Sequence, residues 1–183
     1  MFASSSNKKE KKKDKQRLYV ALYPSGVIGS EEKRYHWGFL TGPKLENQPM
    51  IPGMRYHVRN SANGQWIYEE RPLVDVQASG TLLGRFLIAK VEDEERLVQI
   101  FRENPVVQGD DNWRCRHWVA EALRRINEDG TAVGTSVLDW DKIQAWAREY
   151  IGKKTADGRY ANGTPVGTPR PTWDMLENKE LRP

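Results

Sequence analysis

The strongest constraint on the fold is a change in hydrophobic spacing near Val91. Before this residue, short runs of aromatic and β-branched residues alternate with turn residues, a pattern typical of β-strands. After it, apolar residues recur at intervals of three and four, a spacing typical of amphipathic helices. Strands followed by helices predict an α+β domain, with an antiparallel sheet of about five strands packed against two to three helices.

Individual elements can be assigned from these runs and from the turn residues that bound them. Five strands are predicted, at residues 17–24, 34–40, 54–59, 65–70 and 85–91. The third and fourth form a hairpin, and the last lacks alternation, which indicates burial on both faces. Three helices are predicted, from near Asp93 to before Pro105, along a stripe from Cys115 to Ile126, and over residues 138–151.

The chain of 183 residues has the length of one domain, but its charge is unevenly distributed. Residues 1–17 hold seven Lys or Arg and two Asp or Glu, whereas the remainder holds 22 and 23. We therefore predict a disordered basic leader at residues 1–16, a single domain at residues 17–151 and an extended tail at residues 152–183. Three apolar residues could pin the end of that tail to the body: Trp173, Met175 and Leu176.

Several classes of protein are excluded. No apolar run approaches the roughly 18 residues of a membrane-spanning helix, and no apolar stretch follows the N-terminal lysines as in a secretory signal. These features predict a cytoplasmic protein, with the nucleus as an alternative. Cys115 is the single cysteine, so neither a disulfide nor a multi-cysteine zinc site is expected. No phosphate-binding glycine motif is present, so no cofactor is expected, and the nearly neutral body does not favour nucleic acid as a partner.

Cys115 is the first candidate for chemistry. It falls in the first turn of a predicted helix, where unpaired backbone N–H groups and the helix dipole favour a thiolate. Arg114 and Arg116 flank it, so we expect the pKa of the thiol to be lowered and the sulfur to be nucleophilic. The alternative is that Cys115 lies on an apolar stripe as a small hydrophobic residue packed against the sheet.

Two histidines are candidates for partners of this thiol. His36 is predicted on a strand with Gly38 on the same face, which leaves room for a second group to approach. A neutral imidazole there could take the proton from a thiol that a helix presents to the same sheet. His57, on a neighbouring strand, could hydrogen-bond the other ring nitrogen of His36 and fix its tautomer. Each histidine taken alone could instead be a structural residue bonded to the backbone.

The other polar groups near these candidates are given structural roles. His117 points to a different helix face from Cys115. The acidic pairs at residues 69–70 and 110–111 are expected to cap helices or face solvent, because adjacent side chains diverge. Gln108, upstream of the cysteine, could add an oxyanion donor beside the helix N–H groups.

The order of these motifs resembles a known superfamily. A strand with His36-Trp37-Gly38, then His57 on the next strand and a helix opening with Cys115-Arg116-His117-Trp118-Val119 resemble circularly permuted papain-like proteins. The similarity is greatest to the lecithin:retinol acyltransferase and H-Ras-like phospholipase branch. This resemblance implies that His36 is the general base, that His57 orients it and that Cys115 forms a thioester. The chain as a whole also resembles an uncharacterised family of small fungal proteins.

Three functions are therefore open. The first is a cysteine-dependent hydrolase or acyltransferase that acts on an amide, ester or thioester of a small molecule or peptide. The second is a non-catalytic protein-binding module of the same fold, with exposed aromatic residues such as Trp66 or Trp173 as anchors. The third is a binder of nucleic acid or an anionic surface that uses the lysine-rich leader.

Overall fold

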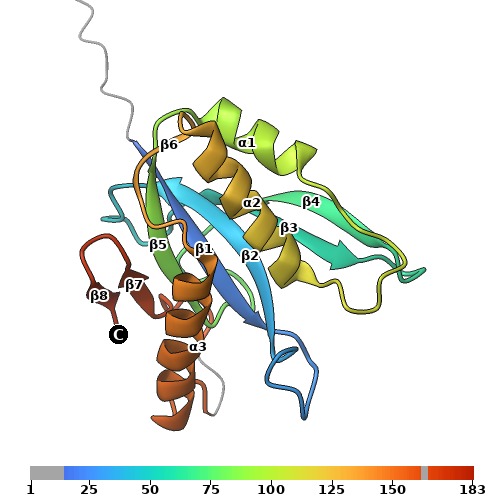
Figure 1. Ribbon diagram of the computed structural model, residues 1–183. Helices are drawn as coiled ribbons and strands as arrows, with labels where there is room; N and C mark the ends of the chain where they lie inside the picture. Colours follow the sequence, from blue (N-terminus) through green and yellow to red (C-terminus); the bar gives the residue numbers. More distant parts are fainter. Residues whose placement is uncertain (1–14, 162–164) are drawn as a thin grey trace, which may run out of the picture.

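The five long strands precede the three helices along the chain, as the change in spacing near Val91 predicts, and three short strands lie between or after the helices (Figure 1). The computed structural model describes residues 15–161 and 165–183. Three helices occur in this part of the chain: α1 (Glu94–Glu103), α2 (Cys115–Asp129) and α3 (Trp140–Ala156). The eight strands are β1 (Gln16–Pro24), β2 (Tyr35–Pro43), β3 (Gly53–Asn60), β4 (Trp66–Leu73), β5 (Gly84–Val91), β6 (Val133–Ser136), β7 (Thr172–Asp174) and β8 (Lys179–Arg182). The α+β class is confirmed.

The sheet is larger than the five antiparallel strands that the sequence predicts. Its order is β4-β3-β2-β1-β5-β7-β8, and β6 pairs with β5 outside this path. The five long strands pair antiparallel, whereas β7 runs parallel to β5, so the sheet is mixed. The three added strands have only three or four residues each, which is too short for an alternating pattern to be recognised.

All three helices contribute to one hydrophobic core on one face of the sheet. In β1, Leu18, Val20 and Leu22 point into this core, and the residues between them point to a smaller cluster on the opposite face. Figure 1 shows α1 and α2 lying across the sheet, with α2 over β2 and β3. This position brings Cys115, the first residue of α2, to β2 at Trp37.

The ends of the helices follow from capping groups. Asp93 and Asp139 accept backbone N–H bonds in the first turns of α1 and α3, and Gly130 adopts the left-handed conformation after α2. The backbone N–H of Arg114 donates to Nδ1 of His117 at 2.9 Å. His117 therefore has the structural role expected of it, as part of the cap of α2.

The segment predicted as an extended tail is largely folded onto the body. Helix α3 continues to Ala156, and β7 and β8 extend the sheet. Met175 is buried in the main core, Leu176 packs against the smaller cluster, and the ring of Trp173 lies 4.9 Å from that of Trp146. These three residues hold the C-terminal segment as the sequence suggests, although the segment forms strands rather than an extended tail.

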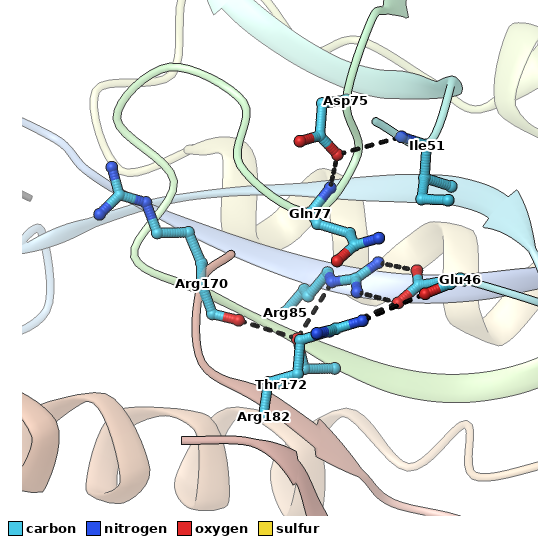
Figure 2. Close-up of polar contacts among 8 residues, drawn as sticks. All are labelled: Glu46, Ile51, Asp75, Gln77, Arg85, Arg170, Thr172 and Arg182. Atoms are coloured by element: carbon cyan, nitrogen blue, oxygen red, sulfur yellow. Dashed lines mark hydrogen bonds and ion pairs between the residues drawn. The ribbon is translucent and has the colours of Figure 1, made fainter. Parts of the chain in front are cut away.

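A buried ion pair fastens this C-terminal segment (Figure 2). Arg85, on β5, is fully buried and donates to both carboxylate oxygens of Glu46, at 2.5 and 2.6 Å. Its Nε donates to Oγ1 of Thr172 on β7 at 3.1 Å, and the side chain of Arg182 donates to the backbone oxygen of Glu46. One guanidinium thus joins β5, β7 and the loop between β2 and β3.

At the N-terminal end, β1 begins at Gln16 and Lys15 forms an ion pair with Glu92. Residues 1–14 of the predicted basic leader lie outside the described residues. Within the described part of the chain, no helix has the length and apolar character needed to cross a bilayer.

Candidate active site

The sulfur of Cys115 lies beside β2 at Trp37, beyond the end of the ladder between β2 and β3. Sγ accepts a hydrogen bond from the backbone N–H of Trp37 on β2 at 3.4 Å. The ladder between β2 and β3 runs only from Phe39 with Tyr56 to Thr41 with Met54. Beyond it the N–H of Trp37 has no strand partner on that side, and the start of α2 brings Sγ to it.

His36 and His57 meet on the face of the sheet opposite the helices. Trp37 and Val58 point into the helix-covered core, so their chain neighbours His36 and His57 point away from it. Nε2 of His36 lies 2.9 Å from Nδ1 of His57, so the predicted hydrogen bond between the rings is present. Sγ bonds to the backbone of Trp37, the chain neighbour of His36, so the thiol and the two rings border the same space although they come from opposite faces.

Gly38 makes this pairing of the histidines sterically possible. A Cβ atom at Gly38 would lie 3.0 Å from Cβ of His57 and 3.1 Å from the backbone oxygen of Tyr56. Both distances are shorter than ordinary carbon contacts, so β3 could not approach β2 as closely with a side chain here. The room beside His36 that the sequence indicates is therefore filled by His57.

Glu69 extends this pair into a row of three side chains. Residues 57 and 69 are cross-strand partners in the β3–β4 hairpin, and Nε2 of His57 lies 2.8 Å from Oε2 of Glu69. The other oxygen of Glu69 accepts from Nε of Arg59 at 3.0 Å. The hydrogen bond from His57 lowers the pKa of Glu69, so this side chain is a carboxylate at neutral pH. Glu69 therefore neither caps a helix nor simply faces solvent, contrary to the expectation for this acidic pair.

The row of hydrogen bonds fixes where the protons are. A carboxylate only accepts, so Nε2 of His57 carries a hydrogen. The pKa of His57 is lowered, chiefly by burial, so its other nitrogen, Nδ1, is bare and accepts from Nε2 of His36. Nδ1 of His36 is then the nitrogen without a hydrogen. The relay of Glu69, His57 and His36 therefore leaves His36 Nδ1 as the atom that can accept a proton.

The electrostatic setting keeps His36 neutral. Burial, followed by the electrostatic interaction with the neighbouring His57 and by the charge of Arg55, lowers its pKa to about 4. The cost of placing a cation in this setting outweighs any gain from protonation at neutral pH. His36 is thus available as a base rather than as an imidazolium.

Cys115 also differs from the expectation of a lowered thiol pKa. Burial raises the pKa of the thiol, because only 6% of the residue is exposed. The backbone N–H groups of Trp37 and Arg116 and the charge of Arg116 act in the opposite direction but do not prevail. The prediction was wrong because the sequence shows the helix end and the arginines but not the depth of the sulfur. Cys115 also packs in the main core, as the alternative interpretation held.

A single cavity of about 850 Å³ contains these groups. Its walls include Cys115, His36 and His57, so the three predicted site residues border the same space. Among the described residues, however, no hydrogen bond connects Sγ to the ring of His36. Such contacts are often loose without substrate and tighten when it binds. In residues 15–161 and 165–183, no cluster of three or more His, Cys, Asp or Glu residues is arranged to hold a metal ion.

Other predicted binding groups have different roles. Gln108 borders the cavity, but its amide exchanges two hydrogen bonds with the backbone of Trp66, at 2.7 and 3.0 Å. It therefore fastens the loop before α2 to β4 and is not a free oxyanion donor. Trp66 and Trp173 are half-buried, and each packs on another tryptophan, so neither is a freely exposed anchor. Trp66 does border the cavity.

Glu69 could have been found from the sequence by extending the hairpin register. Residues 60 and 66 pair at the top of the hairpin, and counting back along both strands places residue 57 opposite residue 69. The five-residue connection between them does not specify its register as strictly as a two-residue turn, which is why the pair was missed.

Comparison with known proteins adds a family assignment. Neither the curated proteins nor the solved structures give a significant match. The model of a family of unknown function, DUF6914, matches residues 15–182, from the residue before β1 to the end of β8. The match includes every strand and helix described above. The chain therefore belongs to the DUF6914 family.

Proposed function

We propose that this protein is a cysteine-dependent hydrolase or acyltransferase, with Cys115 as the nucleophile and His36 as the general base. The observation that carries the proposal is the convergence of Cys115, His36 and His57 on one cavity, with Glu69 completing a relay behind the base. The order of the histidine strands and the cysteine helix is also that of the permuted papain-like proteins, which supports the same roles.

In the first step, Nδ1 of His36 takes the proton of the Cys115 thiol while Sγ attacks a carbonyl carbon. The new C–S bond gives a tetrahedral oxyanion, which N–H groups in the first turn of α2 can stabilise. The leaving group departs with the proton from His36, and a thioester remains. Water or a second acceptor then attacks this thioester, which releases the acyl product and restores the thiol.

The protonation states of the resting site favour this order of steps over a mechanism that starts from a preformed thiolate–imidazolium pair of Cys115 and His36. Burial raises the pKa of Cys115 and lowers that of His36, so both are neutral at pH 7. Proton transfer then accompanies attack on the carbonyl. Nδ1 stays available as a base at any pH above about 4.

The second candidate is a binding module of the same fold without turnover. Two observations favour it: Cys115 packs in the main core, and its sulfur bonds to the backbone of Trp37 rather than to a ring nitrogen. In that case the cavity would bind a partner while the thiol serves as a packed core group.

Acylation of the single cysteine separates the two candidates. The protein would be incubated with p-nitrophenyl acetate, and both p-nitrophenol release and the mass of the intact chain would be recorded. We expect an initial burst and an acetyl adduct in the wild type, a much slower burst in His36→Asn and no adduct in Cys115→Ser. Equal acylation rates in the wild type and His36→Asn would exclude His36 as the base and support the binding module.

A further inference from the structure

The cavity at Cys115 has an unequal number of cations and anions. Its five basic residues are Lys33, Arg55, Arg59, Arg114 and Arg116, and its three acidic residues are Glu32, Asp110 and Asp111. Two of the cations are already neutralised by carboxylates. Arg116 forms an ion pair with Glu32, and Arg59 forms one with Glu69.

Arg55 lies beside the two histidines of the relay and, unlike Arg59, is not paired with Glu69. It precedes His57 by two residues on β3, so both side chains emerge on the same face of the sheet. Its guanidinium lies over the ring of Tyr23, 5.4 Å from the centroid, and that ring lies 6.0 Å from the ring of His36. The charge of Arg55 is one cause of the lowered pKa of both histidines.

No carboxylate of the described residues lies within ion-pair distance of Arg55. Its Nε is buried without a hydrogen-bond partner, and its guanidinium interacts with the hydroxyl of Tyr23, an interaction that opposes the raised pKa of that hydroxyl. Buried donors without partners, above all charged ones, are unfavourable. A guanidinium in this state, on the wall of a cavity, is suited to two parallel hydrogen bonds with a carboxylate or phosphate group.

We infer that the cavity selects an anionic acyl substrate, whose carboxylate or phosphate group binds Arg55 while its carbonyl group lies at Cys115. This inference rests on the proposed function and specifies its substrate class. The anion would satisfy the buried Nε and would occupy the side of the cavity that the two histidines face. The positive charge on Arg114, at the start of α2, adds to the same field.

Two alkylating reagents of nearly the same size test this inference. Iodoacetate carries the carboxylate that iodoacetamide lacks, and Cys115 is the single cysteine, so mass spectrometry of the intact chain reports its modification directly. The measured quantity is the ratio of the iodoacetate rate to the iodoacetamide rate. It is compared with the same ratio for free cysteine at the same pH and ionic strength.

We expect the ratio in the protein to exceed that of free cysteine at least about fivefold, because an ion pair at close range adds this much or more. Arg55→Gln should remove the excess, and Arg55→Lys should retain part of it. Arg71→Gln is the matched control: Arg71 is the cross-strand neighbour of Arg55 but is exposed and lies outside the cavity. This variant should leave the ratio unchanged.

Protection experiments identify the source of the anion. Acetate and inorganic phosphate, each added at constant ionic strength, are compared for their ability to slow iodoacetamide, and the stronger protector identifies the group. The inference would be overturned if the rate ratio in the protein equalled that of free cysteine. It would also be overturned if Arg55→Gln and Arg71→Gln lowered this ratio equally. The proposed function would stand in either case if the iodoacetamide rate still depended on His36, and would fall separately if it did not.

Discussion

Nε2 of His57 lies 2.8 Å from Oε2 of Glu69, its cross-strand neighbour on β4. This contact sets the tautomer of His57 and, through it, leaves Nδ1 of His36 bare. The proposed base is therefore positioned by a carboxylate two side chains away, at the outer end of the relay.

Replacing Glu69 by Gln should reduce the acylation rate of Cys115 by about tenfold or more. A positioned general base usually accelerates a reaction by about 10²–10⁴-fold, and the variant should lose part of this acceleration. The amide can donate to His57 as well as accept from it, so both ring tautomers become populated. Glu70→Gln is the control, because Glu70 pairs with Arg102 instead of the relay. The rates would be compared across pH, and equal rates in the two variants would contradict the role of Glu69.

The lowered pKa of His36 predicts a pH-dependent stability. The unfolded chain binds a proton near pH 6.5, whereas folded His36 does so only near pH 4. Stability from this residue is therefore complete above pH 6.5 and is lost as pH falls toward 4, by up to about 3 kcal/mol. Urea unfolding at pH 7, 6, 5 and 4 should show a smaller loss in His36→Asn than in the wild type. A parallel loss in both proteins would show that His36 has an ordinary pKa.

A methyl group at Gly38 should separate β2 from β3. Gly38→Ala brings Cβ within 3.0 Å of Cβ of His57, so we expect a loss of about 1–3 kcal/mol in stability and slower acylation. The control is Gly152→Ala in α3, where a Cβ would meet nothing within 4 Å and should stabilise the helix by roughly 0.5–1 kcal/mol. Thermal unfolding of both variants would show opposite shifts. An unchanged melting temperature for Gly38→Ala would mean that the strands adjust freely.

The ion pair between Arg85 and Glu46 predicts a larger effect. Glu46→Gln leaves the fully buried guanidinium without a carboxylate, which should cost about 3–5 kcal/mol. Because Arg85 also holds Thr172, limited proteolysis should cut near β7 and β8 first. Asp141→Asn, on the exposed start of α3, is a charge-matched control. Equal protease resistance in both variants would argue against a role of the ion pair in holding this segment.

The sequence predicts most of the architecture because the five long strands are apolar runs bounded by turn residues and the three helices have a clear helical period. It does not predict β6, β7 and β8, which are too short to show a period: β6 and β7 depend on pairing with β5, and β8 depends on pairing with β7. The tail from Thr172 pairs with β5, and Arg85, near the start of that strand, also donates to Thr172, a contact that the sequence alone does not reveal.

The candidate site was predicted in part. The residues Cys115, His36 and His57 border one cavity, and the two rings are hydrogen-bonded, but their catalytic roles remain predictions. Strand alternation alone would place His36 away from the helix that carries Cys115. The thiol and the rings can border one cavity because the ladder between β2 and β3 ends at Phe39 and leaves the edge of β2 at Trp37 open to Sγ. This ladder is only three residue pairs long, and its end could not be predicted from the sequence. Burial of the sulfur is likewise a tertiary property, so the sign of its pKa shift could not be predicted.

That burial has a consequence for the redox chemistry of the chain. Peroxides oxidise thiolates, and a buried, protonated thiol such as Cys115 reacts with them slowly. With no other cysteine in the chain to trap a sulfenic acid as an internal disulfide, protection has to come from the surroundings of the sulfur. The burial that makes the Cys115 thiol a weaker nucleophile in the resting protein therefore also slows its oxidation by peroxides.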